Sequence, residues 1–479
     1  MSVLKSATGR LVIACSSAAA VAYGGSALAA GCINVATSGY LECVTAITVP
    51  GNPIRTFDIS WVDAKRGLYF LGDRSNFGID IIDTKTNSYI GRAGGFLGPL
   101  SAPGVVATPT TNVNNNISGP DGVVSHGRWL YGGDGNSTLR VYDIADPTNP
   151  VFKVAISTGG TTRVDEMALT PDGSIIVVAN NAEDPPFITM MHANGDGASN
   201  TMSASSIISK IIIDPTLVPS GAGLSIEQSA WDPRLGKFIV SVPIIAGNPS
   251  GCNYGQSPGA ITCNGGMAII DPSAVTAGKY TVPAADVVPL VGCGPNGIAV
   301  GPGHQVGEAC NPGNVPSNVG TTIVTDEAPY YQVQTEGVTG GDEIWYDAGT
   351  DKYYVGASKN GPNAGATKFL SPALGVIDPK TKHTIQTIPA SSNSHSIAAD
   401  SKRHYVYDPQ VAPTSVVGSG GDATTNGAAI CGGTNGCIGV FRPRVLPRRD
   451  GDDDDRGHYG DRDDRGDRDH RGDWDRRDD

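Results

Sequence analysis

The stretch Gly341-Asp342-Glu343-Ile344-Trp345-Tyr346-Asp347 decides the fold, because its pattern returns along the chain. An acidic residue opens the pattern, a short apolar and aromatic run follows, and an aspartate suited to a turn closes it. Close copies occupy residues 57–63, 226–232 and 394–400, and looser copies begin at residues 120, 164 and 295. The opening position is held by Asp58, Asp121, Asp165, Glu227, Asn296, Asp342 and His395. Recurrence at about 40 to 50 residues, lengthened by insertions, is typical of propellers and solenoids.

Three further short runs follow most of these opening stretches, and each has the composition of a β-strand. They are rich in β-branched and aromatic side chains and are bounded by Gly, Pro, Asp and Asn. The last unit lacks its fourth run, and residues 42–50, ahead of the first unit, supply one. We therefore predict an all-β, seven-bladed β-propeller whose last blade is closed by this N-terminal strand, because closure removes exposed sheet edges.

The fifth unit, from Asn296 to about residue 337, has the weakest pattern. Its first strand is clear, but residues 303–317 resemble a loop before a strand resumes at residues 321–326. If this unit is not a blade, the propeller has six blades.

Residues 1–29 have the pattern of a secretory signal peptide. Lys5 and Arg10 form a basic start, residues 11–22 form an apolar segment too short to span a bilayer, and Ala27-Leu28-Ala29 forms a cleavage site. No later stretch is apolar enough for a transmembrane helix. We predict an exported protein, periplasmic or extracellular, without a membrane span.

The composition changes abruptly after the propeller, which we place at residues 30–442. Residues 443–479 consist largely of Asp, Arg and Gly, cannot bury enough apolar surface to fold, and are predicted to be disordered. The formal net charge of −13 excludes a nucleic-acid-binding protein, which needs a basic face.

Export changes the interpretation of the nine cysteines. Cys15 leaves with the signal peptide, and the other cysteines fall into local couples in an oxidising compartment. Proximity predicts four disulfides: Cys32–Cys43, Cys252–Cys263, Cys293–Cys310 and Cys431–Cys437. A zinc site would need Cys-x-x-Cys pairs or nearby histidines, and the sequence has neither.

The opening residues should meet around the mouth of the central channel, because the first strand of each blade lines that channel. Carboxylates that close cannot all stay ionised unless a cation compensates them or their pKa values rise. A divalent cation held by Asp58, Asp121, Glu227, Asn296 and Asp342 is one solution, since Ca²⁺ prefers such oxygen ligands. His395 would also admit Zn, Mn or Fe. The alternative is that these groups cap strand starts and hold channel waters.

Loops after the second strands should surround the same mouth. Arg74 and Lys359 lie in these loops and are predicted to contact an anionic or carbonyl-bearing substrate. Glu166 and Glu343 directly follow ring positions, and strand alternation predicts that they point away from their neighbours.

Several phrases resemble those of the YVTN-type bacterial propellers. They are Pro295-Asn296-Gly297-Ile298-Ala299, Ser394-His395-Ser396-Ile397-Ala398, Ile377-Asp378-Pro379 and His404-Tyr405-Val406-Tyr407. The resemblance covers roughly residues 40–442, and the wider superfamily includes regucalcin and gluconolactonase-like enzymes. It implies one divalent cation at the channel mouth, with Glu227, Asn296 and Asp342 as the ligands. Asp165 or His395 would then be the catalytic base.

Two functions from different classes follow. The first is a metal-dependent hydrolase or lyase acting on a small oxygenated substrate, lactone-like or ester-like, in which the metal polarises a carbonyl and a ring acid or His395 moves the proton. The second is a non-catalytic scaffold that binds a protein or cell-surface partner. A ligand-sized pocket over the ring favours the enzyme, and a flat, loop-covered mouth favours the scaffold. We expect a monomer in either case.

Overall fold

The computed structural model describes Cys32 and residues 38–109, 111–193, 202–223, 225–250, 252, 263–310, 322–325, 331–335, 337–360, 372–412 and 424–444. The predicted signal peptide and residues 445–479 of the predicted tail lie outside these ranges. Within them, no helix is both long and apolar enough to cross a membrane. The chain divides into one unit that ends at Pro443 and a second that begins at Arg444, and the fold below is that of the first.

The first two repeats each form a four-stranded antiparallel sheet. One contains β2 (Ser60–Asp63), β3 (Leu68–Asp73), β4 (Gly78–Asp83) and β5 (Ser88–Gly94). The other contains β8 (Val123–His126), β9 (Trp129–Asp134), β10 (Thr138–Asp143) and β11 (Val151–Ser157). Between them, an insertion carries the small hairpin β6 (Leu100–Ala102) and β7 (Val105–Val106) and the 3-10 helix η2 (Asn115–Ile117).

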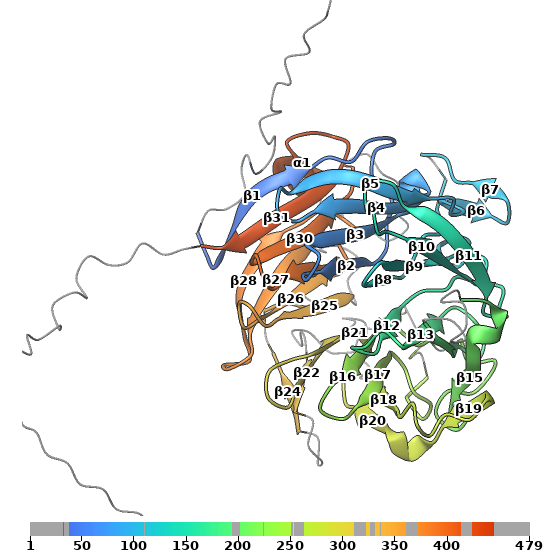
Figure 1. Cartoon of the computed structure of the whole chain (residues 1–479). Helices are drawn as coiled ribbons and strands as arrows, with labels where there is room; N and C mark the ends of the chain where they lie inside the picture. Colours follow the sequence, from blue (N-terminus) through green and yellow to red (C-terminus); the bar gives the residue numbers. More distant parts are fainter. Residues whose placement is uncertain are drawn as a thin grey trace, which may run out of the picture. The chain divides into compact units, whose positions relative to one another are not determined.

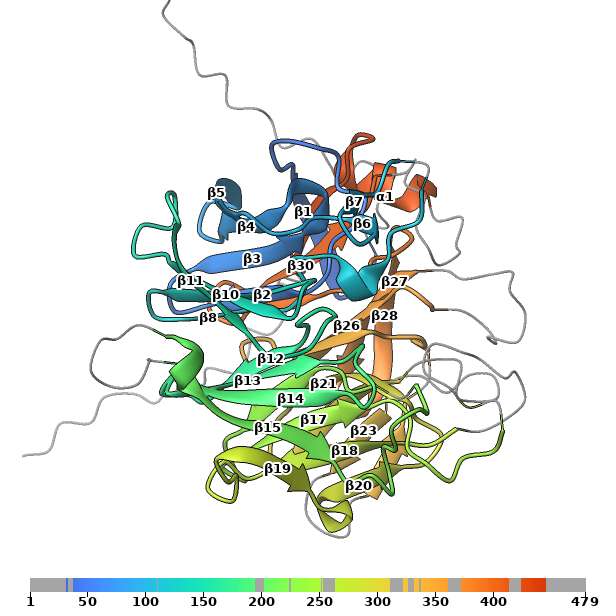
Figure 2. The same cartoon turned by 90° about the vertical axis from the view of Figure 1, so that its right-hand side faces the viewer.

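The third sheet has five strands, because a later segment joins its outer edge. Its own strands are β12 (Met167–Leu169), β13 (Ile175–Asn180), β14 (Phe187–His192) and β15 (Ile207–Ile213). The added strand β19 (Gly278–Val282) pairs with β15 in parallel. Figure 2 shows β19 beside β15. This addition covers an edge that would otherwise be open.

The next three sheets each have four strands. The first contains β16 (Ser229–Asp232), β17 (Lys237–Val242), β18 (Gly265–Ile270) and β20 (Val287–Leu290). The second contains β21 (Pro295–Val300), β22 (Gln305–Cys310), β23 (Thr322–Thr325) and β24 (Tyr331–Gln334). The third contains β25 (Glu343–Asp347), β26 (Lys352–Ala357), β27 (Ala373–Asp378) and β28 (His383–Pro389).

The expected loop at residues 303–317 is wrong over residues 305–310, which form β22. Its small residues Gly307 and Ala309 and its buried Glu308 have low β-propensity, so the strand has little local signal. Pairing with β21 and β23 imposes the extended conformation.

The last sheet confirms the predicted closure. It contains β29 (Ala398–Asp400), β30 (Tyr405–Gln410), β31 (Cys437–Pro443) and, on its outer edge, β1 (Leu41–Ile47). The two ends of the propeller therefore pair antiparallel, with Leu41 opposite Pro443 and Ile47 opposite Ile438. Figure 1 shows β1 beside β31. The helix α1 (Thr424–Cys431) contacts this sheet.

The sheets follow one another in chain order around a ring, from blue at the top of Figure 1 through green and yellow to orange. The innermost strands β2, β8, β12, β16, β21, β25 and β29 contact each other in this order, and β29 contacts β2. Six of the sheets have four strands, and the sheet of β12 has five. The arrangement confirms an all-β propeller. Its core lies between the sheets, as where Trp61 of β2 meets Trp345 of β25 edge to face.

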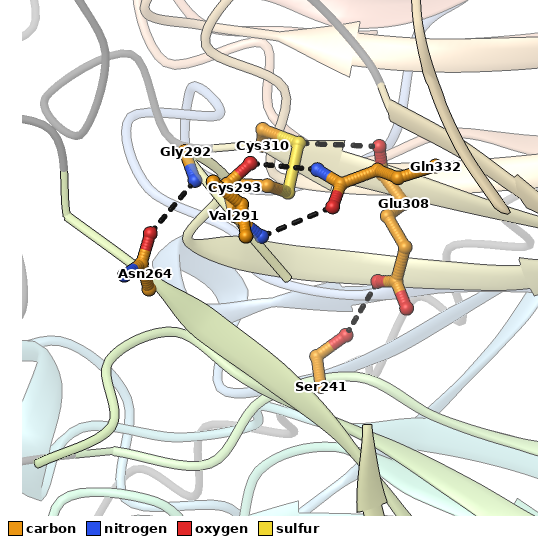
Figure 3. Close-up of a disulfide and its surroundings, with 8 residues drawn as sticks. All are labelled: Ser241, Asn264, Val291, Gly292, Cys293, Glu308, Cys310 and Gln332. Atoms are coloured by element: carbon orange, nitrogen blue, oxygen red, sulfur yellow. Dashed lines mark hydrogen bonds between the residues drawn. A yellow bond between two sulfur atoms is a disulfide. The ribbon is translucent and has the colours of Figure 1, made fainter. Parts of the chain in front are cut away.

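All four predicted disulfides are confirmed: Cys32–Cys43, Cys252–Cys263, Cys293–Cys310 and Cys431–Cys437. Each closes a short loop, with sequence separations of 11, 11, 17 and 6 residues. Cys293–Cys310 joins the segment before β21 to the end of β22 (Figure 3). The cross-links therefore stabilise the propeller at sites where the chain enters or leaves its sheets.

Candidate functional site at the channel mouth

Backbone hydrogen bonds place the opening residues at equivalent positions in their sheets. Five of them donate their backbone N–H to a small residue near the end of the second strand, at 2.8 to 3.0 Å. The donors are Asp58, Asp121, Asp165, Glu227 and Asp342, and the acceptors are the carbonyls of Gly72, Gly133, Ala179, Ser241 and Gly356. The repeated pattern therefore sets the same side-chain position in successive sheets.

Glycines directly after two opening positions let neighbouring inner strands approach closely. A Cβ atom on Gly122 would lie 1.8 Å from the backbone oxygen of Asp165, and one on Gly297 would lie 2.3 Å from that of Asp342. Because only glycine fits at such distances, these positions bring adjacent opening residues together at one end of the channel.

Two arginines lie among three of the aspartates. Carboxylate oxygens of Asp58, Asp121 and Asp165 lie within 4.8 Å of one another. The buried guanidinium group of Arg74 forms ion pairs with Asp58 and Asp121, and its Nε donates to Asp121 Oδ1 at 3.0 Å. Arg163 Nη2 lies 2.7 Å from Asp165 Oδ2, and its Nη1 lies 3.3 Å from Asp58 Oδ2. The chain's own cations therefore compensate these acids.

Burial raises the pKa of each of the three aspartates, whereas the neighbouring guanidinium groups lower it. Burial alone would raise the pKa of Asp58, but Arg74, His395 and Arg163 outweigh it, and the pKa falls well below its usual range. Burial raises the pKa of Asp121 well above its usual range despite Arg74. Burial also raises the pKa of Asp165 to about 6, against the charge of Arg163. The other oxygen of Asp165, Oδ1, is buried without a hydrogen-bond partner among the described residues.

His395 is fixed by acceptors on both ring nitrogens. Its Nε2 lies 3.1 Å from Asp58 Oδ1, and its Nδ1 lies 2.7 Å from the carbonyl of Asn393. The ring also stacks on Phe57 at 4.9 Å. Burial lowers the pKa of His395, but the hydrogen bond to Asp58, the charges of Asp342 and Asp58 and the hydrogen bond to Asn393 together outweigh it, so the pKa is raised. Since both nitrogens face acceptors, His395 is an imidazolium that holds Asp58.

On the opposite side of the mouth, side-chain amide groups donate hydrogen bonds to the acids. Asn181 Nδ2 lies 2.6 Å from Asp165 Oδ2 and 3.3 Å from Glu227 Oε1, so it links the two sides. Asn296 Nδ2 donates to Asp342 Oδ1 at 2.8 Å. The oxygen of Asn296, Oδ1, is buried without a hydrogen-bond partner among the described residues. This side therefore brings the side-chain oxygen atoms of Glu227, Asn296 and Asp342 together with two amide groups.

Glu166 and Glu343 form a buried carboxyl pair. Each carboxyl group shifts the pKa of the other, and Gln228 Nε2 donates to Glu343 Oε2 at 2.6 Å. Burial raises the pKa of Glu343 to about 8 and that of Glu166 well above its usual range. The expectation that these residues point away from the ring is wrong, because both line the channel-mouth cavity. Glu166 precedes β12, so strand alternation does not apply to it, and Glu343 is the first residue of β25.

The channel-mouth cavity has a volume of about 540 Å³. Its lining includes the predicted residues Asp58, Arg74, Asp165, Glu227, Asp342, Lys359 and His395. The side chains of Arg55 and Lys359, both partly exposed, line it without a hydrogen bond or ion pair to any described residue. Residues 112–115 of the insertion between the first two sheets complete the wall. The cavity has the volume of a small-molecule site, and most of the side chains that line it are polar or charged.

Some of these residues were predicted from the sequence and others were not. Asp121 and Asn296 lie beside the cavity but do not line it. Arg74 is 1% exposed and paired with two aspartates, so its guanidinium group is not available in the way predicted. Arg163 and Arg55 were missed, although each precedes an opening residue by a few positions, and that proximity was the available signal.

The metal prediction stays a prediction, but its premise changes. Arg74 and Arg163 pair with the three aspartates of this cluster, so the chain itself supplies part of the compensating charge. Glu227, Asn296 and Asp342 are the remaining predicted ligands, and the unpartnered Asn296 Oδ1 suits a hard cation.

Comparison with known proteins supports the fold. No family model matches the chain, and no curated protein matches it. Among solved structures, hydrazine synthase of Kuenenia stuttgartiensis is similar with a TM-score of 0.50 and 11% sequence identity, over 76% of this chain and 94% of that chain. At this identity the likeness concerns the propeller fold alone, and the resemblance to YVTN-type and regucalcin-like propellers is not confirmed.

Proposed function

We propose that this propeller is an exported hydrolase or lyase that acts on a small oxygenated substrate, such as a lactone or an ester, in the channel-mouth cavity. One observation carries the proposal: a pair of buried acids, Glu166 and Glu343, lines a cavity of about 540 Å³. Asp165 and two cationic side chains line the same cavity. A buried acid, a potential base and cations in one small-molecule site favour catalysis over a scaffold.

The carboxyl pair supplies the proton. Burial raises the pKa of both Glu166 and Glu343, which favours a retained proton on the pair. In the proposed hydrolysis, the pair of Glu166 and Glu343 gives this proton to the leaving alkoxide oxygen when the acyl C–O bond breaks.

Asp165 acts as the base. Its Oδ2 is held by Arg163 and Asn181, which leaves Oδ1 without a partner among the described residues. This oxygen takes a proton from water as the water oxygen bonds to the carbonyl carbon, so that one water and one ester give an acid and an alcohol. A pKa of about 6 suits a base that works near neutral pH.

Cationic groups orient the substrate. Arg55 and Lys359 bind its carbonyl oxygen or a carboxylate, because their side chains have no ion pair among the described residues. Arg74, Arg163 and His395 are positioning residues that hold the aspartates.

A divalent cation, with Ca, Mn, Zn or Fe as the candidates, would be held by Glu227, Asn296 and Asp342. Such an ion supplies Lewis-acid polarisation of a carbonyl group. The support for it is the set of oxygen donors and the unpartnered Asn296 Oδ1.

The test compares Glu343→Gln and Asp165→Asn with the exposed control Asp286→Asn, using δ-valerolactone and p-nitrophenyl acetate as probes. We expect kcat to fall about 100-fold or more in both cavity variants, the range of acid–base catalysis, and to stay unchanged in the control. Elemental analysis of the parent and of Glu227→Ala tests the metal separately. Full activity in both cavity variants would contradict the mechanism. A parent inactive on both probes, with and without added Ca, Mn or Zn, would favour the protein-binding scaffold.

We also infer the number of blades and the export of the protein. A blade number of seven is supported because β12 of the five-stranded sheet contacts β8 and β16, just as the innermost strands of the other sheets contact their neighbours. Export is supported by four disulfides, which persist in oxidising compartments. The signal peptide and the disordered tail remain predictions from composition.

A further inference from the structure

A second cleft adjoins the channel-mouth cavity. Its volume is about 240 Å³, and it lies between the insertion that carries β6 and β7 and the loop before β2. Apolar side chains dominate its wall, including Phe77, Pro99, Val106 and Pro109. Nothing in the proposed mechanism uses this cleft.

The two spaces share part of their lining. Arg55, Thr56 and Val113 line both the cavity and the cleft. A ligand in the cavity can therefore extend past Arg55 into the cleft. Arg55 stands at this junction, and its side chain has no ion pair among the described residues.

Both walls of the cleft are held in place. The backbone N–H groups of Arg55 and Thr56 donate to Ser75 Oγ at 2.8 and 2.9 Å. In the insertion, Ala107 N–H donates to the carbonyl of Pro99 at 2.7 Å. Gly98, with φ of +77°, lies directly against the Phe77 ring, since a Cβ there would be 2.2 Å from that ring.

The insertion is also hydrogen bonded to a residue of the channel mouth. Asn114 N–H donates to the carbonyl of Leu100 at 2.7 Å, and Arg163 N–H donates to the carbonyl of Asn116 at 2.9 Å. The same segment thus walls the cleft, contacts an arginine of the channel mouth and contributes residues 112–115 to the cavity. The cleft and the cavity therefore adjoin each other at Arg55, Thr56 and Val113.

We propose that the second cleft binds an apolar side group of the substrate, an aromatic ring or a short alkyl chain, while Arg55 binds a carboxylate or carbonyl oxygen at the junction. The inference rests on the proposed function, because it takes the channel-mouth cavity as the substrate site. The cleft is larger than an engineered cavity of about 150 Å³ that holds benzene, so one ring fits. The substrate is therefore an amphiphile with a polar reacting group and one apolar arm.

Binding of two unreactive carboxylates tests the proposal. Isothermal titration of the full chain with 4-phenylbutyrate and with butyrate compares ligands that differ by one phenyl group. We expect phenylbutyrate to bind about tenfold or more tightly, because burial of the ring adds affinity. Val106→Asp should reduce this ratio to about one, and Arg55→Gln should weaken both ligands. Val106 is 49% exposed, so the substitution leaves the fold intact.

Val151→Asp is the matched control, because Val151 on β11 is 47% exposed and lies outside both spaces. It should leave the ratio unchanged. Equal binding of the two carboxylates by the parent, no binding at about 1 mM, or an unchanged ratio in Val106→Asp would each overturn the proposal. If phenylbutyrate binds as expected but the parent hydrolyses no probe, the cleft assignment stands and the proposed reaction fails.

Discussion

At the channel mouth, the carboxylates of Asp58 and Asp121 contact the guanidinium group of Arg74, whereas the carboxyl group of Glu308 between β22 and β17 contacts a hydroxyl group. Ser241 Oγ lies 3.4 Å from Glu308 Oε2 (Figure 3), and Glu308 Oε1 has no hydrogen-bond partner among the described residues. Both sites are buried, with Glu308 fully so. They show two ways in which a propeller keeps acids inside.

The difference is one of charge state. Near Arg74, Arg163 and His395 the pKa of Asp58 is lowered, so its carboxylate stays ionised and holds the cations in place. Burial raises the pKa of Glu308 well above its usual range, and the Ser241 hydroxyl lowers it only in part. Glu308 is therefore uncharged where Asp58 is charged. A buried carboxylate needs a cation, and without one it keeps its proton.

Removal of the central cation should have the largest effect. Arg74→Met leaves Asp58 and Asp121 buried without their main partner, which should lower the free energy of unfolding by about 3–5 kcal/mol. Guanidinium chloride unfolding at neutral pH measures it. The double variant Arg74→Met/Asp121→Asn should recover part of the loss. A decrease below about 1 kcal/mol, which is typical of an ion pair on the surface, would contradict the argued difference between the channel mouth and the site of Glu308.

Acid titration should show the charged state of Asp58. Because its folded pKa is lowered, its contribution to stability is present above its unfolded pKa and is lost as the pH falls through the folded value. As the pH falls from the unfolded to the folded pKa of Asp58, the free energy of unfolding of the parent should decrease by about 2–3 kcal/mol because of this residue, as is typical of a salt-bridged aspartate. Asp58→Asn should lack that loss, although it is less stable at neutral pH. Urea unfolding between pH 2 and about 6 measures both curves. Parallel curves would contradict the assignment.

Glu308 should show the opposite and smaller dependence on pH. Its folded pKa is raised, so its contribution to stability is present below its unfolded pKa and is lost as the pH rises toward the folded value. Glu308→Gln removes this titration, and it should be more stable than the parent by about 1–2 kcal/mol at alkaline pH but not at acidic pH. Thermal unfolding at several pH values measures the difference, with the exposed Asp286→Asn as control. A constant difference at all pH values would indicate a change in packing instead.

The sequence predicted the repeats, the closing strand and the cysteine pairs, because each leaves a local pattern. The opening residues recur in front of strands, and their backbone N–H groups accordingly occupy equivalent positions in five sheets. The cysteines lie close in the chain, so proximity alone identified their partners. By contrast, β22 was mistaken for a loop because Gly307, Glu308 and Ala309 have little strand propensity and pairing alone extends them.

The sequence by itself thus determined which residues occupy equivalent positions in their sheets, since position in a repeat fixes position in a ring. What these residues do there depends on partners distant in the chain. Arg163 reaches Asp58 across 105 positions, and Gln228 reaches Glu343 across 115. Only the tertiary structure could show that arginines compensate the aspartates, that the buried acids Glu166 and Glu343 line one cavity, and that an insertion adds an apolar cleft. Burial and the spatial neighbours of a group decide its charge, and neither is encoded in local spacing.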